Sequence, residues 1–193
     1  MTDDFVLEIL TDDSGRKTAS ESFFVPKTGV TGVVLSEREI EATGKFLIEN
    51  GARGYLKKSS LFPRMTVRDN LTCFAMYDGK DPDKVLDFAA KVGLNIDDVK
   101  KFDEMDDFGK YLALFVQAAV NYSDLYVFYA DIKNKSLCSL DAFQAVEALG
   151  KKSAVLVFAE NEESLKFCDR ILGSAVPSVS GLNVKTDAEA KCE

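Results

Sequence analysis

Three short apolar runs constrain the fold of this chain more than any other feature of its sequence. They cover residues 30–35, 125–130 and 154–159, and most of their members are β-branched, aliphatic or aromatic. A strand that is apolar at nearly every position is buried on both faces, as in a parallel sheet with helices on either side. The runs therefore predict a central, mostly parallel sheet in a chain of 193 residues.

Helical patterns separate the apolar runs. They cover residues 37–50, 107–121, 140–149 and 162–172. All but the second are followed directly by a glycine, a residue that suits the left-handed conformation in which many helices end. The alternation of strands and helices predicts an α/β fold with right-handed crossovers.

Three further segments lie outside this alternation. Residues from about 66 to 120 begin with two helical patterns and no convincing strand, so they are expected to form a small helical insertion. Near the amino end, residues 6–10 and 22–25 alternate around a turn and predict a short antiparallel pair. Residues 174–193 shift to small and polar types, and we expect a tail or linker there with a short strand at 179–184.

The charge and composition exclude several classes of function. A net charge of -8 and a pI of about 4.7 repel a phosphate backbone, so direct nucleic-acid binding is not expected. Histidine is absent and the four cysteines form no CxxC pair, so no metal site is predicted and the thiols are expected to stay reduced. The first residues are acidic, and no apolar run approaches the roughly 20 residues that span a bilayer. We therefore expect a cytoplasmic protein without membrane insertion.

Residues 61–71 read LFPRMTVRDNL, and this run resembles the segment that follows the Q-loop of ATP-binding cassette (ABC) ATPases. Four other stretches follow the family's order, at the positions of its P-loop strand, its signature helix and Walker B strand, its D-loop and its switch strand. They are residues 22–35, 117–131, 139–141 and 155–161. The resemblance implies a P-loop NTPase-like (ABC ATPase-like) domain over residues 1–173, with a mostly parallel sheet flanked by helices.

The P-loop of that family has the pattern GxxxxGK[S/T], whose glycines let backbone N–H groups approach the phosphates while the lysine neutralises them. Residues 36–43 read SEREIEAT here, with no glycine, and Glu41 falls at the lysine position. Ser36 and Glu39 have the spacing of a capping box, in which each side chain satisfies the other residue's backbone N–H. The sequence therefore predicts a helix start that is closed by the chain itself and that repels phosphate.

The other motif positions also lack the residues with which the family binds or hydrolyses nucleotide. The Q-loop glutamine corresponds to Lys57, the Walker B aspartate to Ala130, the catalytic glutamate to Asp131 and the switch histidine to Glu160. The signature motif falls near residues 106–110, which read DDFGK. By this comparison the resemblance implies no catalytic residues, no nucleotide cofactor and no metal.

The resemblance then implies a catalytically inactive domain that acts in regulation through protein contact. In the family, the Q-loop and the adjoining helical region meet the cytoplasmic coupling helix of a membrane permease. The corresponding docking residues would be Phe62, Pro63, Arg64, Val67 and Arg68. The chain is also similar to degenerate ABC domains that precede a LytTR DNA-binding domain in bacterial transcription regulators, which implies a fused DNA-binding partner. The sequence also leaves open that the chain forms a homodimer.

Two alternatives remain open from the sequence. The chain could be an ATP-binding subunit of an ABC transporter with rearranged motifs, which would bind ATP with Mg²⁺. It could instead be an unrelated doubly wound domain that binds a small molecule at the carboxyl edge of its strands. For LFPRMTVRDNL itself, the plainer interpretation is a loop leading into a helix capped by Thr66.

Overall fold

The computed structural model describes residues 4–13, 16–54, 61–97, 99–130 and 140–173, and it contains the predicted parallel sheet. The sheet has five strands in the order β4, β5, β6, β3, β7, and every neighbouring pair is parallel. The strands are β3 (Gly29–Val34), β4 (Arg53–Gly54), β5 (Leu125–Tyr129), β6 (Ala154–Ala159) and β7 (Arg170–Gly173). All six residues of β6 are buried, as a strand that is apolar at every position requires.

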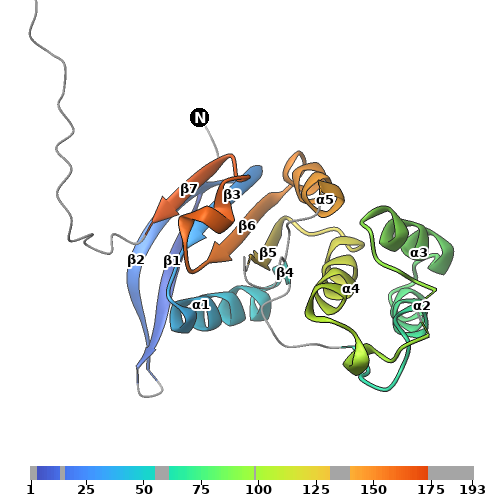
Figure 1. Cartoon of the computed structure of the whole chain (residues 1–193). Coiled ribbons are helices and arrows are strands. Elements are labelled where there is room, and N and C mark those ends of the chain that lie inside the picture. Colours follow the sequence, from blue (N-terminus) through green and yellow to red (C-terminus); the bar gives the residue numbers. More distant parts are fainter. Residues whose placement is uncertain (1–3, 14–15, 55–60, 98, 131–139, 174–193) are drawn as a thin grey trace, which may run out of the picture.

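Helices cover the sheet on both faces (Figure 1). The helices that pack against its strands are α1 (Glu37–Glu49), α4 (Asp107–Ala119) and α5 (Leu140–Gly150). Because side chains alternate along a strand, neighbouring residues of β5 enter different cores. Phe128 lies in the core that contains Phe115 of α4, whereas Val127 lies in the core that contains Ile40 of α1.

An antiparallel ribbon precedes the sheet, as the alternation near the amino end predicted. It consists of β1 (Asp4–Asp13) and β2 (Arg16–Pro26). Leu7 and Val25 face inward and are each 1% exposed. The Thr43 hydroxyl of α1 accepts from the Leu10 N–H at 2.8 Å, next to the point where the register of the ribbon shifts. These contacts attach the ribbon to α1.

Between β4 and β5 the chain forms a helical part. It consists of α2 (Val67–Tyr77), α3 (Pro82–Lys91), the short 3-10 helix η1 (Phe102–Glu104) and α4. The three α-helices pack together around Leu71, Ala89 and Phe115, which are all 0% exposed. The two helical patterns expected here are α2 and α3. In the described part of the chain, no helix is both long enough and apolar enough to cross a bilayer.

The prediction of a helix over residues 162–172 is wrong. The chain instead forms a short 3-10 helix, η2 (Glu162–Leu165), and then β7. Asn161 caps η2 by accepting from the Ser164 N–H at 3.0 Å, and β7 then pairs with the side of β3 that faces away from β6. Pairing outweighs the local helical preference, because an uncovered edge would leave buried backbone groups of β3 without partners.

One strand of the sheet was not predicted, and one predicted strand cannot be compared with the structure. β4 was missed because its two residues are too few to show an alternating pattern. Gly54 is required there, since a Cβ atom would collide with the Val127 carbonyl oxygen of β5. The strand expected at 179–184 lies outside the described residues, as does the rest of 174–193.

Candidate functional site

The family resemblance places a site at the carboxyl ends of the parallel strands, and the connection from β3 to α1 is its centre. β3 ends at Val34 and α1 begins at Glu37, so Leu35 and Ser36 alone connect them. Leu35 is 2% exposed, and its N–H donates to the Ala159 carbonyl at 2.9 Å. The connection is therefore a tight turn that continues the sheet hydrogen bonding, and it leaves no length of chain for a glycine-rich loop.

Glu39 closes the start of α1. Its carboxylate accepts from the Ser36 N–H at 2.9 Å and from the Ser36 hydroxyl at 2.7 Å. The predicted capping box is present, and its hydrogen bonds are those that the Ser36 N–H and hydroxyl donate to Glu39. An anion at this helix start would have to displace a carboxylate that already interacts favourably with the helix dipole.

Glu41 lies on the exposed side of α1, between the buried residues Ile40 and Ala42. Glu37 and Glu39 add two more acids in the first turn of the same helix. The start of α1 therefore carries three carboxylates and one positive charge, on Arg38, in a chain whose net charge is -8. This arrangement repels a phosphate group on approach.

The ends of β5 and β6 are also held by bonds within the chain. Ala130 is 2% exposed, and its N–H donates to a carbonyl of β6 at 2.8 Å. Glu160 is exposed and accepts from the Tyr129 hydroxyl at 2.9 Å. A methyl group at Ala130 offers no oxygen to the water shell of Mg²⁺. The two other motif positions, Lys57 and Asp131, lie outside the described residues.

The start of α4, where the signature motif falls, is capped as well. The Asp106 carboxylate accepts from the Gly109 N–H at 2.7 Å. The space over Gly109 is filled, because a Cβ atom there would lie 2.7 Å from Met105 Cε and 3.0 Å from Asp106 Oδ1. Both helix starts at which the resemblance would place phosphate are therefore occupied by the chain's own carboxylates. Across the described residues, no group of three or more His, Cys, Asp and Glu side chains could hold a metal ion.

The residues expected to dock a partner surround the loop before α2. Phe62 is 61% exposed, and Pro63, Arg64 and Arg68 also lie at the surface. Val67 is a correction to this set, since it is 0% exposed and packs in the core below the loop. Val67 therefore supports the surface from beneath and cannot contact a partner.

Asn70 fixes the shape of that loop, a role that the sequence analysis missed. Asn70 is 2% exposed. Its side chain accepts from the Phe62 N–H at 2.7 Å and donates to the carbonyls of Phe62 and Thr66 at 3.0 and 3.1 Å. The segment around η1 adds two backbone hydrogen bonds to the loop, at 2.9 and 3.0 Å. The sequence did hold one sign that Asn70 is buried. It lies three residues after Val67, which places both on the same, buried side of α2.

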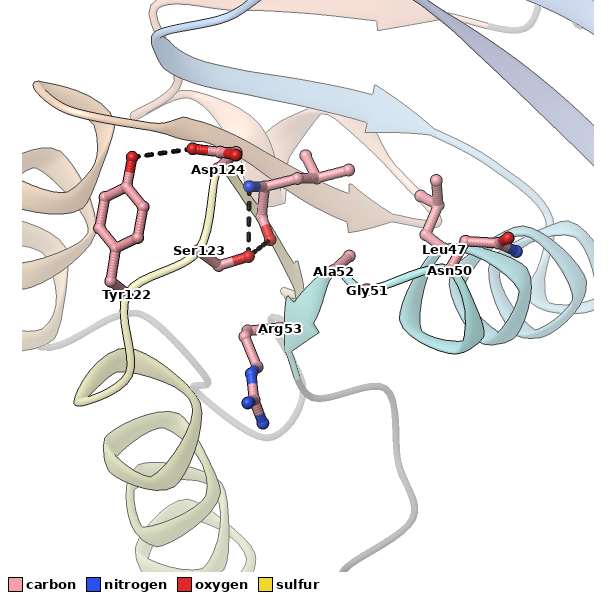
Figure 2. A pocket seen from close by; sticks show the side chains of 9 residues that line it. Leu47, Asn50, Gly51, Ala52, Arg53, Tyr122, Ser123 and Asp124 are labelled. Atoms are coloured by element: carbon pink, nitrogen blue, oxygen red, sulfur yellow. Dashed lines mark hydrogen bonds between the residues drawn. The ribbon is translucent and has the colours of Figure 1, made fainter. Parts of the chain in front are cut away.

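A cavity of about 430 Å³ lies at the opposite, amino edge of the sheet (Figure 2). Its lining comes from the end of α1, the start of β4 and the turn that leads into β5. The Tyr122 hydroxyl points at Asp124 and donates to its carboxylate at 2.8 Å, whereas the Arg53 side chain extends away from that pair. This hydrogen bond and the negative charge of Asp124 raise the pKa of Tyr122. The cavity adjoins the end of α1 that is remote from Ser36.

The fold is that of ABC-type ATP-binding cassettes: an antiparallel ribbon, a parallel sheet with β3 between β6 and β7, and a helical part between β4 and β5. A Pyrococcus furiosus protein described as the ATP-binding protein of an ABC transporter matches with a TM-score of 0.63 at 13% identity, over 88% of this chain and 97% of that chain. A bacterial ABC transporter cassette solved as a dimer matches with a TM-score of 0.59 at 11% identity, over 87% and 92% of the two chains. The RNase-L inhibitor gives a TM-score of 0.62 at 11% identity, and the chain spans 37% of it.

At these identities the likeness concerns the fold alone. It confirms the predicted fold class and excludes an unrelated doubly wound domain as the fold. No family model matches the sequence, and no curated protein matches it either.

Proposed function

We propose that this chain is an ABC ATPase-like domain without nucleotide chemistry that acts through protein contact. The observation that carries the proposal is the two-residue connection between β3 and α1, closed by Glu39. Phosphate binding at a helix start needs free backbone N–H groups and room for a loop around the anion. Here Ser36 and Glu39 occupy that end. A close like-charge contact with phosphate costs on the order of 1 kcal/mol in water and several in a partly buried cleft.

The other positions at which the chain departs from the family's motifs support the same proposal. Asp106 closes the start of α4, where the signature motif of an active cassette would be expected to meet nucleotide. Ala130 has no oxygen to orient a metal's water, and Glu160 is an acceptor already engaged by Tyr129. Together with Glu41 at the P-loop lysine position, these replacements all remove groups that phosphate or Mg²⁺ would need.

The proposed contact surface is the exposed side of the loop before α2, with Phe62, Pro63, Arg64 and Arg68 as its members. We call it the loop surface. Aromatic and arginine side chains are enriched at the centres of protein interfaces. Asn70 and η1 hold the loop in one conformation, so a partner would bind it with little loss of conformational entropy.

Two kinds of partner fit this proposal, both in the cytoplasm. One is the coupling helix of a membrane permease, which the likeness to transporter cassettes favours. The other is a DNA-binding domain of LytTR type fused in a bacterial transcription regulator, which the eroded motifs favour. In that case residues 1–173 would be the regulatory domain and 174–193 the beginning of a linker, and the chain could act as a homodimer.

An ATP-binding transporter subunit with rearranged motifs is the second candidate function. The observation that favours it is the shared fold over 97% of the Pyrococcus furiosus protein, whose description includes ATP binding. It would require a phosphate site built from residues other than those at the start of α1.

Calorimetric titration with ATP and Mg²⁺ separates the two candidates, with an active ABC cassette as the positive control. We expect no binding heat, and a melting temperature that saturating ATP changes by less than about 1 °C, because only a bound ligand stabilises the folded state. A micromolar dissociation constant would overturn the proposal and establish the second candidate.

A further inference from the structure

The outer face of the ribbon formed by β1 and β2 carries an apolar pair that the fold does not explain. Val6 and Phe24 are cross-strand partners and are 54% and 71% exposed. The opposite face of the ribbon is buried, and antiparallel sheets with one buried face normally present polar residues on the other. Scattered exposed apolar residues are common, but these two are fixed next to each other by the register of the strands.

Acidic residues flank the apolar pair. Residues two apart in a strand share a face, so Asp4 and Glu8 lie on the same side as Val6, one before it and one after it. Both carboxylates are on exposed residues. Their Cα atoms are about 13 Å apart in an extended strand, with Val6 midway between them. The face therefore has an apolar centre and an acidic rim along β1.

Arg170 of β7 also reaches this region. Its Nη2 donates to the Phe24 carbonyl at 2.9 Å, and its Nε donates to the Thr31 hydroxyl at 3.3 Å. The guanidinium is thus engaged with β2 and β3, and it holds the backbone of Phe24 in place. The Phe24 side chain remains exposed while its main chain is anchored, which suits a preorganised contact residue.

We propose that this face, the ribbon surface, docks a segment of a partner protein that carries one large apolar side chain between two basic residues. The apolar side chain would cover Val6 and Phe24, and lysine or arginine residues on either side would meet Asp4 and Glu8. In an extended segment, basic residues two positions before and after the anchor have the same spacing as the two acids. Nucleic acid and anionic lipid surfaces are disfavoured, because the rim charge is negative. The ribbon surface is separate from the loop surface, so this inference is independent of the proposed function.

The test begins with selection of displayed random peptides on the full chain, with counter-selection on Phe24→Ser. We expect enrichment of peptides with an aromatic or aliphatic residue flanked by Lys or Arg. Anisotropy titrations of a labelled enriched peptide should then show binding that Phe24→Ser weakens about tenfold or more. Tyr77→Ser is the matched control, since Tyr77 is a 91% exposed aromatic residue on α2, and it should leave the affinity unchanged.

The second part of the test is a charge swap on the ribbon surface. Asp4→Lys with Glu8→Lys should weaken the basic peptide and favour a version whose flanking residues are glutamate, and higher salt should weaken the wild-type complex. Enrichment of peptides without basic residues, equal binding to Phe24→Ser, or no enrichment at all would overturn the proposal. A dimer in sedimentation velocity that Phe24→Ser abolishes would also overturn it, because the occupant would then be a second copy of this chain.

Discussion

Asn70 determines the conformation of the loop that carries the proposed loop surface. A polar side chain that is 2% exposed must find hydrogen-bond partners, and Asn70 finds them in the backbone of residues 62 and 66. The amide group can donate and accept at once, so it satisfies both an N–H and carbonyl groups of the same loop. The exposed position of Phe62 therefore depends on a residue that no partner would touch.

Asn70→Ala should lower the free energy of unfolding by about 3 kcal/mol, because three hydrogen bonds between a buried side chain and the loop backbone are lost, at about 1 kcal/mol each. The matched control is Asn50→Ala at an exposed site, whose side-chain amide donates to the Phe46 carbonyl at 2.8 Å. The control should cost about 1 kcal/mol or less. Urea unfolding of the two variants measures the difference, and equal losses would contradict the role given to Asn70.

Cys168 is a second residue whose chemistry follows from its surroundings. Burial, and then the charge of Asp169, raise the pKa of the Cys168 thiol from its usual 9.0 to about 12. The folded state therefore holds the thiol proton more tightly than the unfolded state. This stabilising contribution is fully present below pH 9.0 and is lost as the pH rises from there to about 12.

Native alkylation followed by peptide mass spectrometry checks this assignment. Near pH 8, Cys168 should react at least about tenfold more slowly than the exposed Cys73, because the thiolate is the reactive form. The two rates should become similar in denaturing urea. Fast native labelling of Cys168 would show that its partly buried thiol is neither shielded from the reagent nor held protonated.

At the scale of elements, the sequence was most informative where a strand is buried on both faces. The runs that became β3, β5 and β6 were recognisable because nearly every position is buried, in the core on one face of the sheet or in the core on the other. β7 was not, since its four residues follow a polar segment and its partner β3 lies far away in the sequence. A short strand that forms because it pairs with a strand far away in the sequence shows little hydrophobic periodicity of its own, so the local sequence does not predict it.

The start of α4 provides the element-scale prediction. Asp106→Ala should cost about 1 kcal/mol of unfolding free energy, because the Gly109 N–H loses its cap. Asp107→Ala changes the neighbouring acid, which precedes Phe108 in the first turn, and should cost only about 0.3 kcal/mol through the helix dipole. Asp106→Asn should retain most of the stability, since asparagine also caps well. If Asp107→Ala proves as costly as Asp106→Ala, charge rather than the hydrogen bond stabilises this helix start.

At the scale of the whole molecule, fold and chemistry are specified by different residues. The apolar strands, the ribbon and the packed helices reproduce the cassette fold at 11–13% identity. The sequence predicted the closed start of α1 because Ser36 and Glu39 are close in the chain and their interaction is local. It did not reveal the ribbon surface or the role of Asn70, because both depend on which residues face each other after folding.

The absence of histidine gives the last prediction. Histidine is the side chain whose unperturbed pKa falls between about pH 5 and 8, and this chain has none. The free energy of unfolding should therefore change by less than about 0.5 kcal/mol between about pH 6 and pH 8, while added salt raises it by screening the net charge of -8. Urea unfolding across this range measures both effects. A general acid or base poised near neutral pH would shift stability by about 1 kcal/mol per pH unit, since each differentially bound proton contributes about 1.4 kcal/mol. A slope of that size would reveal a tuned catalytic group and contradict the proposed loss of nucleotide chemistry.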